Sequence, residues 1–309
     1  MRIVHISCVV GARPNFIKMA SILEEIRRRK RFAGRLIHTG QHFSPEMSDT
    51  FFTDLGMLQP DEHLNVPPGT QTTQTAHIMQ SLERSFTEHH PDLVLVVGDV
   101  NSTLAAALVA AKLEMPIAHV EAGLRSFDRR MPEEINRIVT DTLSDYLFVS
   151  EPSGMRNLHA EGASKDRIFF VGNVMIDTLL RFRNQASQSN ILESLGLEPR
   201  SYAVATLHRP ANVDDAERLR GLTGALARLA ERIPVVFPAH PRTRRRMEES
   251  GVAATGLLLT PPMGYLDFLR LTSQARLVLT HLLHHVGGSR SFPAGCNFEN
   301  GLVTRFLSA

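Results

Sequence analysis

An apolar run, an alanine-rich helical pattern and a second apolar run follow one another in the middle of the chain. The runs are PDLVLVVGDV (91–100) and IAHVEAG (117–123), and the helical pattern between them is NSTLAAALVAAKLEM (101–115), with Asn101 or Ser102 as its expected cap. A strand, a crossover helix and a strand of these lengths place the two strands side by side and parallel. The sequence therefore predicts an open α/β sheet.

Two carboxylates fall at the ends of these strands. Asp99 lies near the end of the first run and Glu121 near the end of the second, and ligands bind at the carboxyl edge of open α/β sheets. The stretch HVEAGLRSFDRRMPEEINR (119–137) adds Glu133 and several arginines, Arg137 among them. Carboxylates mixed with guanidinium groups at this edge indicate acid/base chemistry beside an anionic ligand. The alternative is a solvated loop and helix start whose charges pair with one another, which is common on protein surfaces.

The start of the chain repeats the pattern. RIVHISCVV (2–10) is strand-like, and Pro14 suits the first turn of a helix that is expected to run to about Arg29. Arg13 and Lys18 flank the amino end of that helix, where backbone N–H groups already favour an anion, so they are predicted phosphate ligands. A loop cation paired with a neighbouring acid is the alternative for Arg13. The loop GARPNF is not a G-x-G-x-x-G sequence, which disfavours a nicotinamide cofactor.

A second α/β half is expected from about residue 170, where FFVGNVMID (169–177) is predicted to supply a strand. SYAVATLHRP (201–210) and IPVVFPAH are strand-like and end in His208 and His240, with an amphipathic helix between them. GLLLT, MGYLDFLRLTSQ and ARLVLT complete a further strand-helix-strand unit. This order predicts two similar sheets that face each other across a cleft, with both histidines contacting a ligand at strand ends.

Composition excludes several classes of protein. The 309 residues are 43% hydrophobic and carry a formal charge of +2, which suits two cores and gives little reason to expect nucleic acid; the run from Arg242 to Arg246 is interpreted as one solvated helix face. Cys8 and Cys296 form neither a disulfide framework nor a metal pattern, so we expect no metal site and a reducing cytoplasm. The apolar stretch 104–121 is interrupted by charges and a proline, so no membrane span and a soluble protein are expected.

Seven motifs in order resemble the non-hydrolysing UDP-N-acetylglucosamine 2-epimerases, from about residue 3 to residue 280. They are GARPNFIKMA, TGQHFSPEMSDTFF, GDVNSTLAAALVA, HVEAGLRSFDRRMPEEINRIVTD, VGNVMID, TLHRPANVD and VFPAHPRT. The resemblance implies an α/β fold like that of the GT-B glycosyltransferases, with an N-terminal Rossmann-like domain over 1–170 and a nucleotide-binding Rossmann-like domain over 171–280. It also implies a UDP-sugar ligand, a homodimer and no redox cofactor.

The activity that the resemblance implies is reversible conversion of UDP-GlcNAc into UDP-ManNAc, by elimination of UDP to a 2-acetamidoglucal and re-addition to the other face. Such a reaction needs carboxylates at C2 and cations around the leaving diphosphate. The assignment of acid and base among the carboxylates stays open. The residues that match the family are, for catalysis, Asp99, Glu121, Glu133 and His208; for substrate binding, Arg13, Lys18, Arg137, His240 and Phe268; and near a second, regulatory nucleotide site, Gln41 and His42. For Phe268 a core position is the alternative.

The resemblance is lost after Thr280. The segment 281–309 reads HLLHHVGGSRSFPAGCNFENGLVTRFLSA, so we expect an incomplete second domain followed by an aberrant tail, with a reading-frame change near codon 281 as the hypothesis. The histidines of this segment are interpreted as adventitious metal ligands rather than a site. Two other functional classes stay open: a GT-B glycosyltransferase that transfers the sugar to an acceptor, and a non-catalytic remnant.

Overall fold

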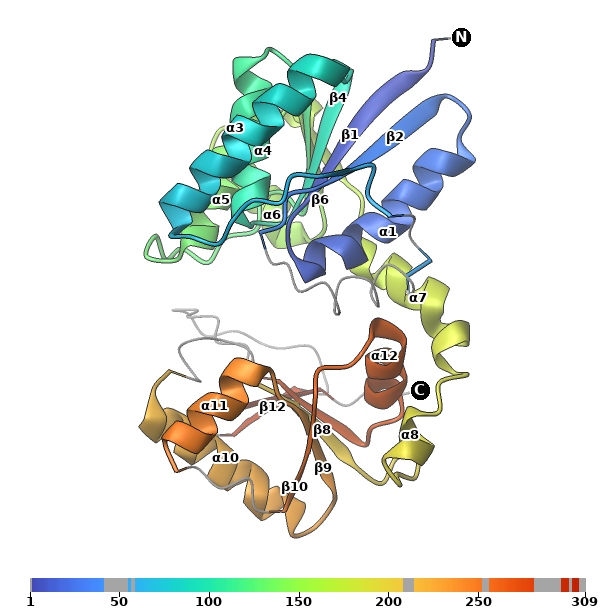
Figure 1. Ribbon diagram of the computed structural model, residues 1–309, viewed down its shortest axis with the longest axis vertical. Coiled ribbons are helices and arrows are strands. Elements are labelled where there is room, and N and C mark those ends of the chain that lie inside the picture. The colour runs from blue at the N-terminus through green and yellow to red at the C-terminus, as the bar shows by residue number, and fades with distance from the viewer. Residues whose placement is uncertain are drawn as a thin grey trace. The chain divides into compact units, whose positions relative to one another are not determined.

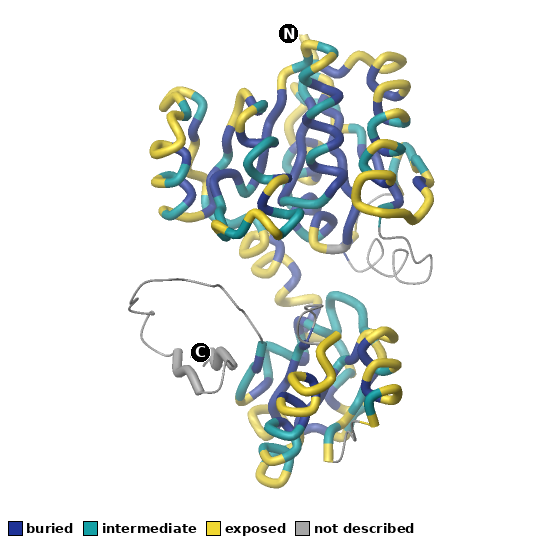
Figure 2. The backbone as a smooth tube through the Cα atoms, turned by 90° about the vertical axis from the view of Figure 1, so that its left-hand side faces the viewer, coloured by how far each residue is buried: buried dark blue, intermediate teal, exposed yellow. Residues whose placement is uncertain are grey.

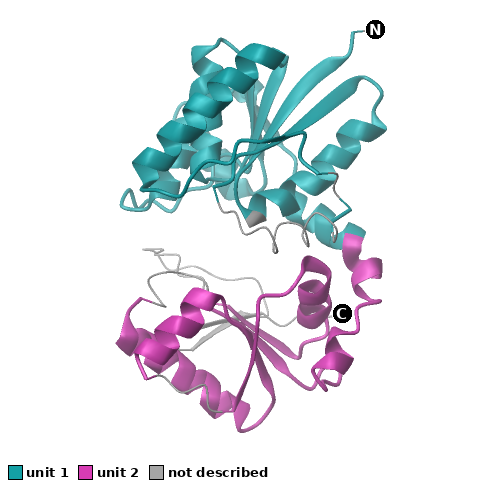
Figure 3. Cartoon of the chain, viewed as in Figure 1, with its two compact units in different colours: residues 1–181 teal, residues 182–309 magenta. Residues whose placement is uncertain are grey.

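The protein is described from a computed structural model that covers residues 2–41, 55–56, 59–207, 214–251, 256–280, 296–299 and 302–305. The chain divides into two compact units, Met1–Arg181 and Phe182–Ala309 (Figure 3). Each unit contains its own β-sheet. The division falls inside the helix α7 (Val174–Ala186).

The first unit is built on a parallel sheet whose strand order, over the described residues, is β3-β2-β1-β4-β5-β6-β7 (Figure 1). Every neighbouring pair in it is parallel. The strands are β1 (Val4–Val10), β2 (Phe32–His38), β3 (Glu62–His63), β4 (Leu93–Val97), β5 (Ile117–Val120), β6 (Tyr146–Val149) and β7 (Ile168–Phe170).

Helices cover both faces of this sheet (Figure 1). The helix α1 begins at Arg13 with a proline in its first turn, as the sequence predicts. The helices of the unit that lie in the described residues are α1 (Arg13–Arg28), α3 (Gln71–His89), α4 (Asn101–Lys112), α5 (Pro132–Leu143), α6 (Pro152–Ala160), a 3₁₀ turn (Lys165–Arg167) and the start of α7.

The core of the first unit explains why its central strands are apolar without interruption. Val94 and Val96 of β4 pack with Ile78 and Phe86 of α3 and with the alanine-rich face of α4, and all of them are buried. Because helices cover both faces, neither face of β4 needs polar residues. Figure 2 shows the buried strands inside a shell of half-exposed helices.

The strand-helix-strand unit predicted in the middle of the chain is confirmed: Val94 of β4 pairs with Ile117 of β5 in parallel register. Its predicted cap is wrong. The N-cap of α4 is Val100, which supplies no side-chain hydrogen bond. The Oε1 atom of Gln41, distant in sequence, accepts the backbone N–H of Ser102 at 3.0 Å instead. The side chain of Asn101 is occupied elsewhere, since its Nδ2 donates to Gln74.

The second unit contains a sheet of order β10-β9-β8-β11-β13-β12 over the described residues. The first four strands are parallel, as predicted, and β13 and β12 are antiparallel. Its elements are β8 (Ala203–Thr206), β9 (Val235–Pro238), β10 (Leu257–Thr260), β11 (Leu277–Thr280), β12 (Cys296–Glu299), β13 (Leu302–Arg305), α8 (Ile191–Ser194), α10 (Ala216–Ala230), α11 (Pro241–Glu249) and α12 (Tyr265–Ser273).

The predicted strand FFVGNVMID (169–177) is a strand only in its first two residues, and the predicted helix after Gly172–Asn173 begins earlier than expected. β7 ends at Phe170 and is part of the first sheet, and residues 174–177 of the stretch FFVGNVMID already belong to α7. Gly172 has a φ of +81°, which allows the chain to turn between the two elements. The short apolar run within VMID is compatible with either a strand or a helix, because periodicity cannot distinguish the two in a window this short.

Candidate active site

The candidate residues of the first unit gather at the carboxyl ends of β4 and β5. Asp99 lies two residues after β4, and Glu121 follows β5 directly. Lys18 comes from α1, which follows β1. β1 connects through α1 to β2 on one side, whereas its other neighbour, β4, connects through α4 to β5 on the opposite side. Such a switch point is where open α/β sheets bind ligands.

Glu121 has an unusual backbone conformation and a buried cationic partner. Its φ is +71°, in the left-handed region that non-glycine residues seldom adopt. Its Oε2 atom is paired with Nζ of Lys18, and the two side chains are 12% and 10% exposed. Strain of this kind costs on the order of 1–3 kcal/mol and collects at functional sites. Among the predicted site residues with a described backbone, Glu121 has this conformation, and its catalytic role stays a prediction.

Gly98 lets Lys18 approach the strand end closely. Its φ is +68°, and a Cβ atom built on it would lie 2.9 Å from Nζ of Lys18 and 3.3 Å from Nδ2 of Asn15. The Asn15 amide also donates to the Val97 carbonyl at 2.8 Å. A side chain at position 98 would displace both groups, so only glycine fits here.

Asp99 is held by α5. Its carboxylate pairs with Arg137, and its backbone carbonyl accepts a hydrogen bond from Nδ2 of Asn136 at 2.8 Å. The side chain of Asp99 is 28% exposed, so it is accessible to solvent. Arg137 also bonds to Glu134 at 3.0 Å and is thereby held in place beside Asp99.

Glu134 shapes the loop after β5. It is 1% exposed and accepts hydrogen bonds from the Ser126 backbone N–H, the Ser126 hydroxyl, the Phe127 backbone N–H and Arg137. Burial alone would raise the pKa of Glu134, but these donors outweigh it and hold the pKa below its ordinary value. A carboxylate with so many donors has a structural role. Glu133 is half-buried one residue earlier and has no polar partner within the described part of the chain.

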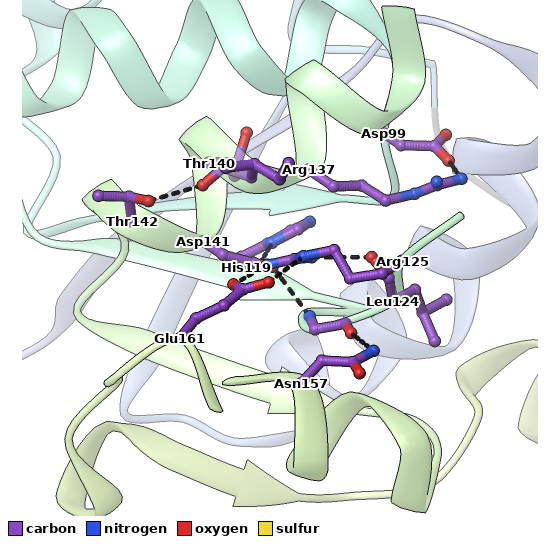
Figure 4. Close-up of polar contacts among 12 residues, drawn as sticks. Asp99, His119, Leu124, Arg125, Arg137, Thr140, Asp141, Thr142, Asn157 and Glu161 are labelled. Carbon is purple, nitrogen blue, oxygen red and sulfur yellow. Dashed lines mark hydrogen bonds and ion pairs between the residues drawn. The ribbon is translucent and has the colours of Figure 1, made fainter. Parts of the chain in front are cut away.

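A second buried network lies next to this loop and was missed by reasoning from the sequence. Nδ1 of His119 lies 2.7 Å from Asp141, whose other oxygen accepts a contact of 2.7 Å from Arg125, and Arg125 also pairs with Glu161 at 2.6 Å (Figure 4). His119 is 0% exposed. Burial alone would raise the pKa of Asp141, but His119 and Arg125 outweigh it and lower it. The histidine of HVEAG, in a buried strand two residues before a candidate carboxylate, is the signal that identifies the network.

Gln41 is placed in the first unit as part of a polar network. Its Oε1 accepts from the backbone and the hydroxyl of Ser102, and the Thr39 hydroxyl lies 2.8 Å from the same Ser102 hydroxyl. Gln41 thus contributes to the start of α4, and a regulatory role for it stays a prediction. His42, His208 and the side chain of Arg13 lie outside the described residues.

Two predicted ligand residues belong to the second unit. His240 is exposed and caps α11, since its Nδ1 accepts the backbone N–H of Arg242 at 3.3 Å. Phe268 of α12 is partly buried against a cluster that includes Tyr202 and Leu271. The core packing suggested as the alternative for Phe268 is therefore present, and its stacking on uracil stays a prediction.

The arrangement in the first unit suits proton transfer next to an anion. Two carboxylates at adjacent strand ends each have one cationic partner and are partly accessible, while Glu134 and Asp141 are buried and saturated with donors. Over the residues with a described position, no three His, Cys, Asp or Glu side chains are grouped to hold a metal ion. The same residues contain no helix that is long and apolar enough to cross a membrane.

Comparison with known proteins identifies the family of the chain. The profile of the UDP-N-acetylglucosamine 2-epimerase family matches residues 24–281. A UDP-N-acetylglucosamine 2-epimerase homolog of Methanococcus maripaludis is 43% identical over 88% of this chain and 77% of its own. The UDP-2,3-diacetamido-2,3-dideoxy-D-glucuronate 2-epimerase of Pseudomonas aeruginosa is 42% identical over 88% of this chain and 76% of its own.

Among solved structures, the UDP-GlcNAc 2-epimerase of Methanocaldococcus jannaschii, in complex with UDP-GlcNAc and UDP, matches 90% of this chain and 79% of its own with 38% identity and a TM-score of 0.83. The predicted fold class, two Rossmann-like α/β domains of the GT-B type, is confirmed. The profile match covers most of the chain, and relatives well above 30% identity match over most of their own length. The chain belongs to the UDP-N-acetylglucosamine 2-epimerase family.

Proposed function

We propose that this chain catalyses the reversible epimerisation of UDP-GlcNAc at C2 to give UDP-ManNAc. The observation that carries the proposal is the pair of carboxylates, Asp99 and Glu121, at neighbouring strand ends, each bonded to a cation. Glu121 occupies a strained left-handed conformation, which is typical of functional sites. Relatives up to 43% identical are named UDP-N-acetylglucosamine 2-epimerase or a homolog of this enzyme.

The chemistry proceeds by elimination and re-addition. A carboxylate removes the C2 proton while the C1–O bond to the diphosphate breaks, which gives a 2-acetamidoglucal and UDP. Re-addition of UDP at C1, with protonation of C2 on the other face, completes the epimerisation. Asp99, Glu121 and Glu133 are the proposed acids and bases, because general acid/base groups must lie within hydrogen-bond reach of the proton they move.

Cations stabilise the departing diphosphate in this proposal. Lys18 and Arg137 are each paired with a candidate carboxylate in the first unit, and a bound diphosphate replaces part of that pairing with its own charge. Arg13, His240 and Phe268 are further proposed substrate-binding residues, and His208 is a further proposed catalytic residue. The enzyme is further proposed to be a cytoplasmic homodimer with UDP-sugars as its ligands.

Proton NMR with UDP-GlcNAc in heavy water tests the activity. Elimination and re-addition exchange the C2 hydrogen with solvent, so deuterium at C2 together with new UDP-ManNAc signals is the expected result. A folded sample that shows neither contradicts the proposal. Acceptor-dependent transfer of the sugar would instead reveal a glycosyltransferase, and stabilisation by UDP-GlcNAc without turnover would reveal a binding protein.

A second substrate merits the same test because of one comparison. The relative named for UDP-2,3-diacetamido-2,3-dideoxy-D-glucuronate is 42% identical, almost as similar as the first relative at 43%. Its sugar has an additional acetamido group at C3 and a carboxylate, and the same C2 chemistry applies to it. The ratio of kcat/KM for the two sugar nucleotides decides which is the substrate.

A further inference from the structure

Asp141 holds the turn that carries Glu121 at two points. One carboxylate oxygen lies 2.7 Å from Nδ1 of His119, two residues before Glu121, and the other accepts the backbone N–H of Gly123, two residues after it, at 3.0 Å. Glu121 therefore lies midway along a stretch whose two ends bond to the same carboxylate. This bridge keeps the turn closed, and the closed turn maintains the φ of +71° at Glu121.

The other nitrogen of the same histidine reaches the strand that carries Asp99. Nε2 of His119 lies 2.8 Å from the carbonyl oxygen of Gly98, the residue before Asp99. The backbone N–H of Gly98 donates to the Val120 carbonyl at 3.0 Å. Both the N–H and the carbonyl of Gly98 are thus bonded to residues of β5. These two bonds fix the backbone before Asp99 relative to Glu121.

Both contacts of His119 are with hydrogen-bond acceptors. A carboxylate and a backbone carbonyl can both accept from the ring only when both nitrogens carry hydrogen. With both nitrogens protonated, the network would hold two cationic and two anionic side chains, since Arg125 pairs with both Asp141 and Glu161. The side chains of His119, Arg125 and Asp141 are 0%, 1% and 3% exposed, and buried charges are retained where they are paired and hydrogen-bonded.

We propose that His119 and Asp141 form a positioning unit for the two candidate catalytic carboxylates. Asp141 closes the backbone turn at Glu121, and the doubly hydrogen-bonded ring of His119 fixes the Gly98 carbonyl before Asp99. Neither residue contacts the substrate in this scheme. The catalytic consequence rests on the proposed function, in which Asp99 and Glu121 act on C2.

A buried histidine with a purely structural role needs hydrogen-bond partners for its ring nitrogens, but these partners can lie anywhere in the core. Both bonds of His119 end instead on backbone adjoining a candidate carboxylate, and both oxygens of Asp141 bond to residues that flank Glu121. Loss of this unit moves the reacting groups while leaving the nucleotide contacts intact. Since a displacement of about 1 Å at a reacting centre costs roughly 100-fold in rate, the effect falls on kcat rather than on KM.

Asp141→Asn tests the unit. Its amide replaces one acceptor with a donor that faces either His119 or the Gly123 N–H. We expect kcat for C2 exchange to fall by roughly 100-fold with KM within about threefold of the wild-type value. Asp145→Asn is the matched control, because Asp145 accepts the Ile117 N–H at 2.9 Å at the opposite end of β5; its kcat should be unchanged.

Two substitutions of His119 separate positioning from stability. His119→Gln keeps an N–H near the position of Nε2 and is expected to stay within about tenfold of wild type in kcat, whereas His119→Ala loses roughly 100-fold. Thermal melts accompany both variants. If folded His119→Ala or folded Asp141→Asn retains wild-type kcat, or if Asp145→Asn loses as much as Asp141→Asn, the proposal is overturned. Should Asp141→Asn not fold, the two His119 variants decide.

A measurement without turnover separates this proposal from the proposed function. Wild-type protein labelled with ¹⁵N-histidine is expected to show a hydrogen on both ring nitrogens of His119 at neutral pH, with the signals assigned by their loss in His119→Gln. A bare nitrogen contradicts the bridging role even in an active enzyme. If both nitrogens carry hydrogen and wild type exchanges no C2 proton of either sugar nucleotide, the proposed function fails and the structural bridge stands.

Discussion

Carboxylate side chains lie at both edges of the first sheet, but they have different roles at the two edges. At the amino edge, Asp92 and Asp145 precede β4 and β6. Each accepts the backbone N–H of a neighbouring strand at 2.9 Å, from His5 and Ile117 respectively, and returns its own N–H to the carbonyl of the same residue. These carboxylates fix the stagger of adjacent strands.

Asp92 also pairs with a cation, Arg2, but at the carboxyl edge the two candidate carboxylates have cations in place of strand N–H groups as their described partners. Asp99 pairs with Arg137 and Glu121 with Lys18. The backbone there is left-handed at Gly98, Glu121 and Gly123, with φ values of +68°, +71° and +80°. Cationic partners can be exchanged for an anionic ligand, whereas strand N–H groups cannot leave the sheet. The difference between the edges is therefore one of which partners a carboxylate has.

The largest effect on activity is expected from a substitution at the carboxyl edge. Glu121→Gln removes the proposed proton-transfer group while preserving its shape. We expect the rate of C2 exchange to fall by about 10²–10⁴-fold, the usual range for general acid/base groups. Heavy-water NMR measures it, and an unchanged melting temperature shows that the fold survives. An exchange rate like that of wild type would remove Glu121 from the mechanism.

The left-handed backbone of this edge is tested by Gly123→Ala. A Cβ atom there would lie 2.4 Å from the carbonyl oxygen of Gly154 and 2.8 Å from its Cα. Backbone clash and φ strain together are expected to destabilise the first unit by about 2–5 kcal/mol. Gly162→Ala is the matched control, because its φ is +82° with nothing within 4 Å of the added atom, and it should cost about 1 kcal/mol. Urea unfolding compares them, and equal losses would show that crowding plays no part.

Glu134→Gln sharpens the comparison, because this carboxylate lies near the carboxyl edge but has a structural role. The pKa of Glu134 is lowered in the folded protein, so its stabilisation is present above the unfolded pKa of about 4.3 and is lost as the pH falls through the folded pKa. At pH 7 the variant should be about 1–3 kcal/mol less stable, since an amide cannot accept all of the donors.

The stability gap between wild type and Glu134→Gln should narrow as the pH falls below about 4. Denaturation midpoints across pH 3–7 measure it. Glu133→Gln is the control, because Glu133 is without a polar partner among the described side chains, and its stability should follow wild type. A gap that stays constant with pH would show that the carboxylate charge of Glu134 does not contribute.

The smallest effect is expected at the amino edge. Asp145→Ala removes one acceptor from the start of β5 and should cost about 1 kcal/mol, the net value of an ordinary hydrogen bond. The rate of C2 exchange should remain that of wild type. Loss of activity without loss of stability would contradict the division of roles between the two edges.

The sequence was sufficient for the order of elements and for the residues at the carboxyl edge. The central strands are continuous apolar runs because both of their faces are covered, and such runs are recognisable without a structure. Asp99 and Glu121 could be predicted as residues of this edge because they lie at the carboxyl ends of two of these runs. The parallel pairing of β4 with β5 confirmed this interpretation.

Local patterns failed in two places. The start of α4 is bonded by Gln41, about sixty residues away in the chain, so no window around Asn101 reveals it. The apolar VMID stretch has the composition of a strand but belongs to α7. The first failure comes from a tertiary contact, and the second from a window too short to distinguish a helix from a strand.

The sequence by itself determined the alternating α/β order, the family and the set of charged residues at one edge of the first sheet, because hydrophobic period and motif order are properties of the chain. Only the tertiary structure decided which carboxylates are saturated and which are accessible. Glu133 and Glu134 are adjacent in sequence, yet only Glu134 is buried under backbone donors. A side chain's partners depend on what the fold brings against it, and for His119 and Asp141 those partners come from different elements.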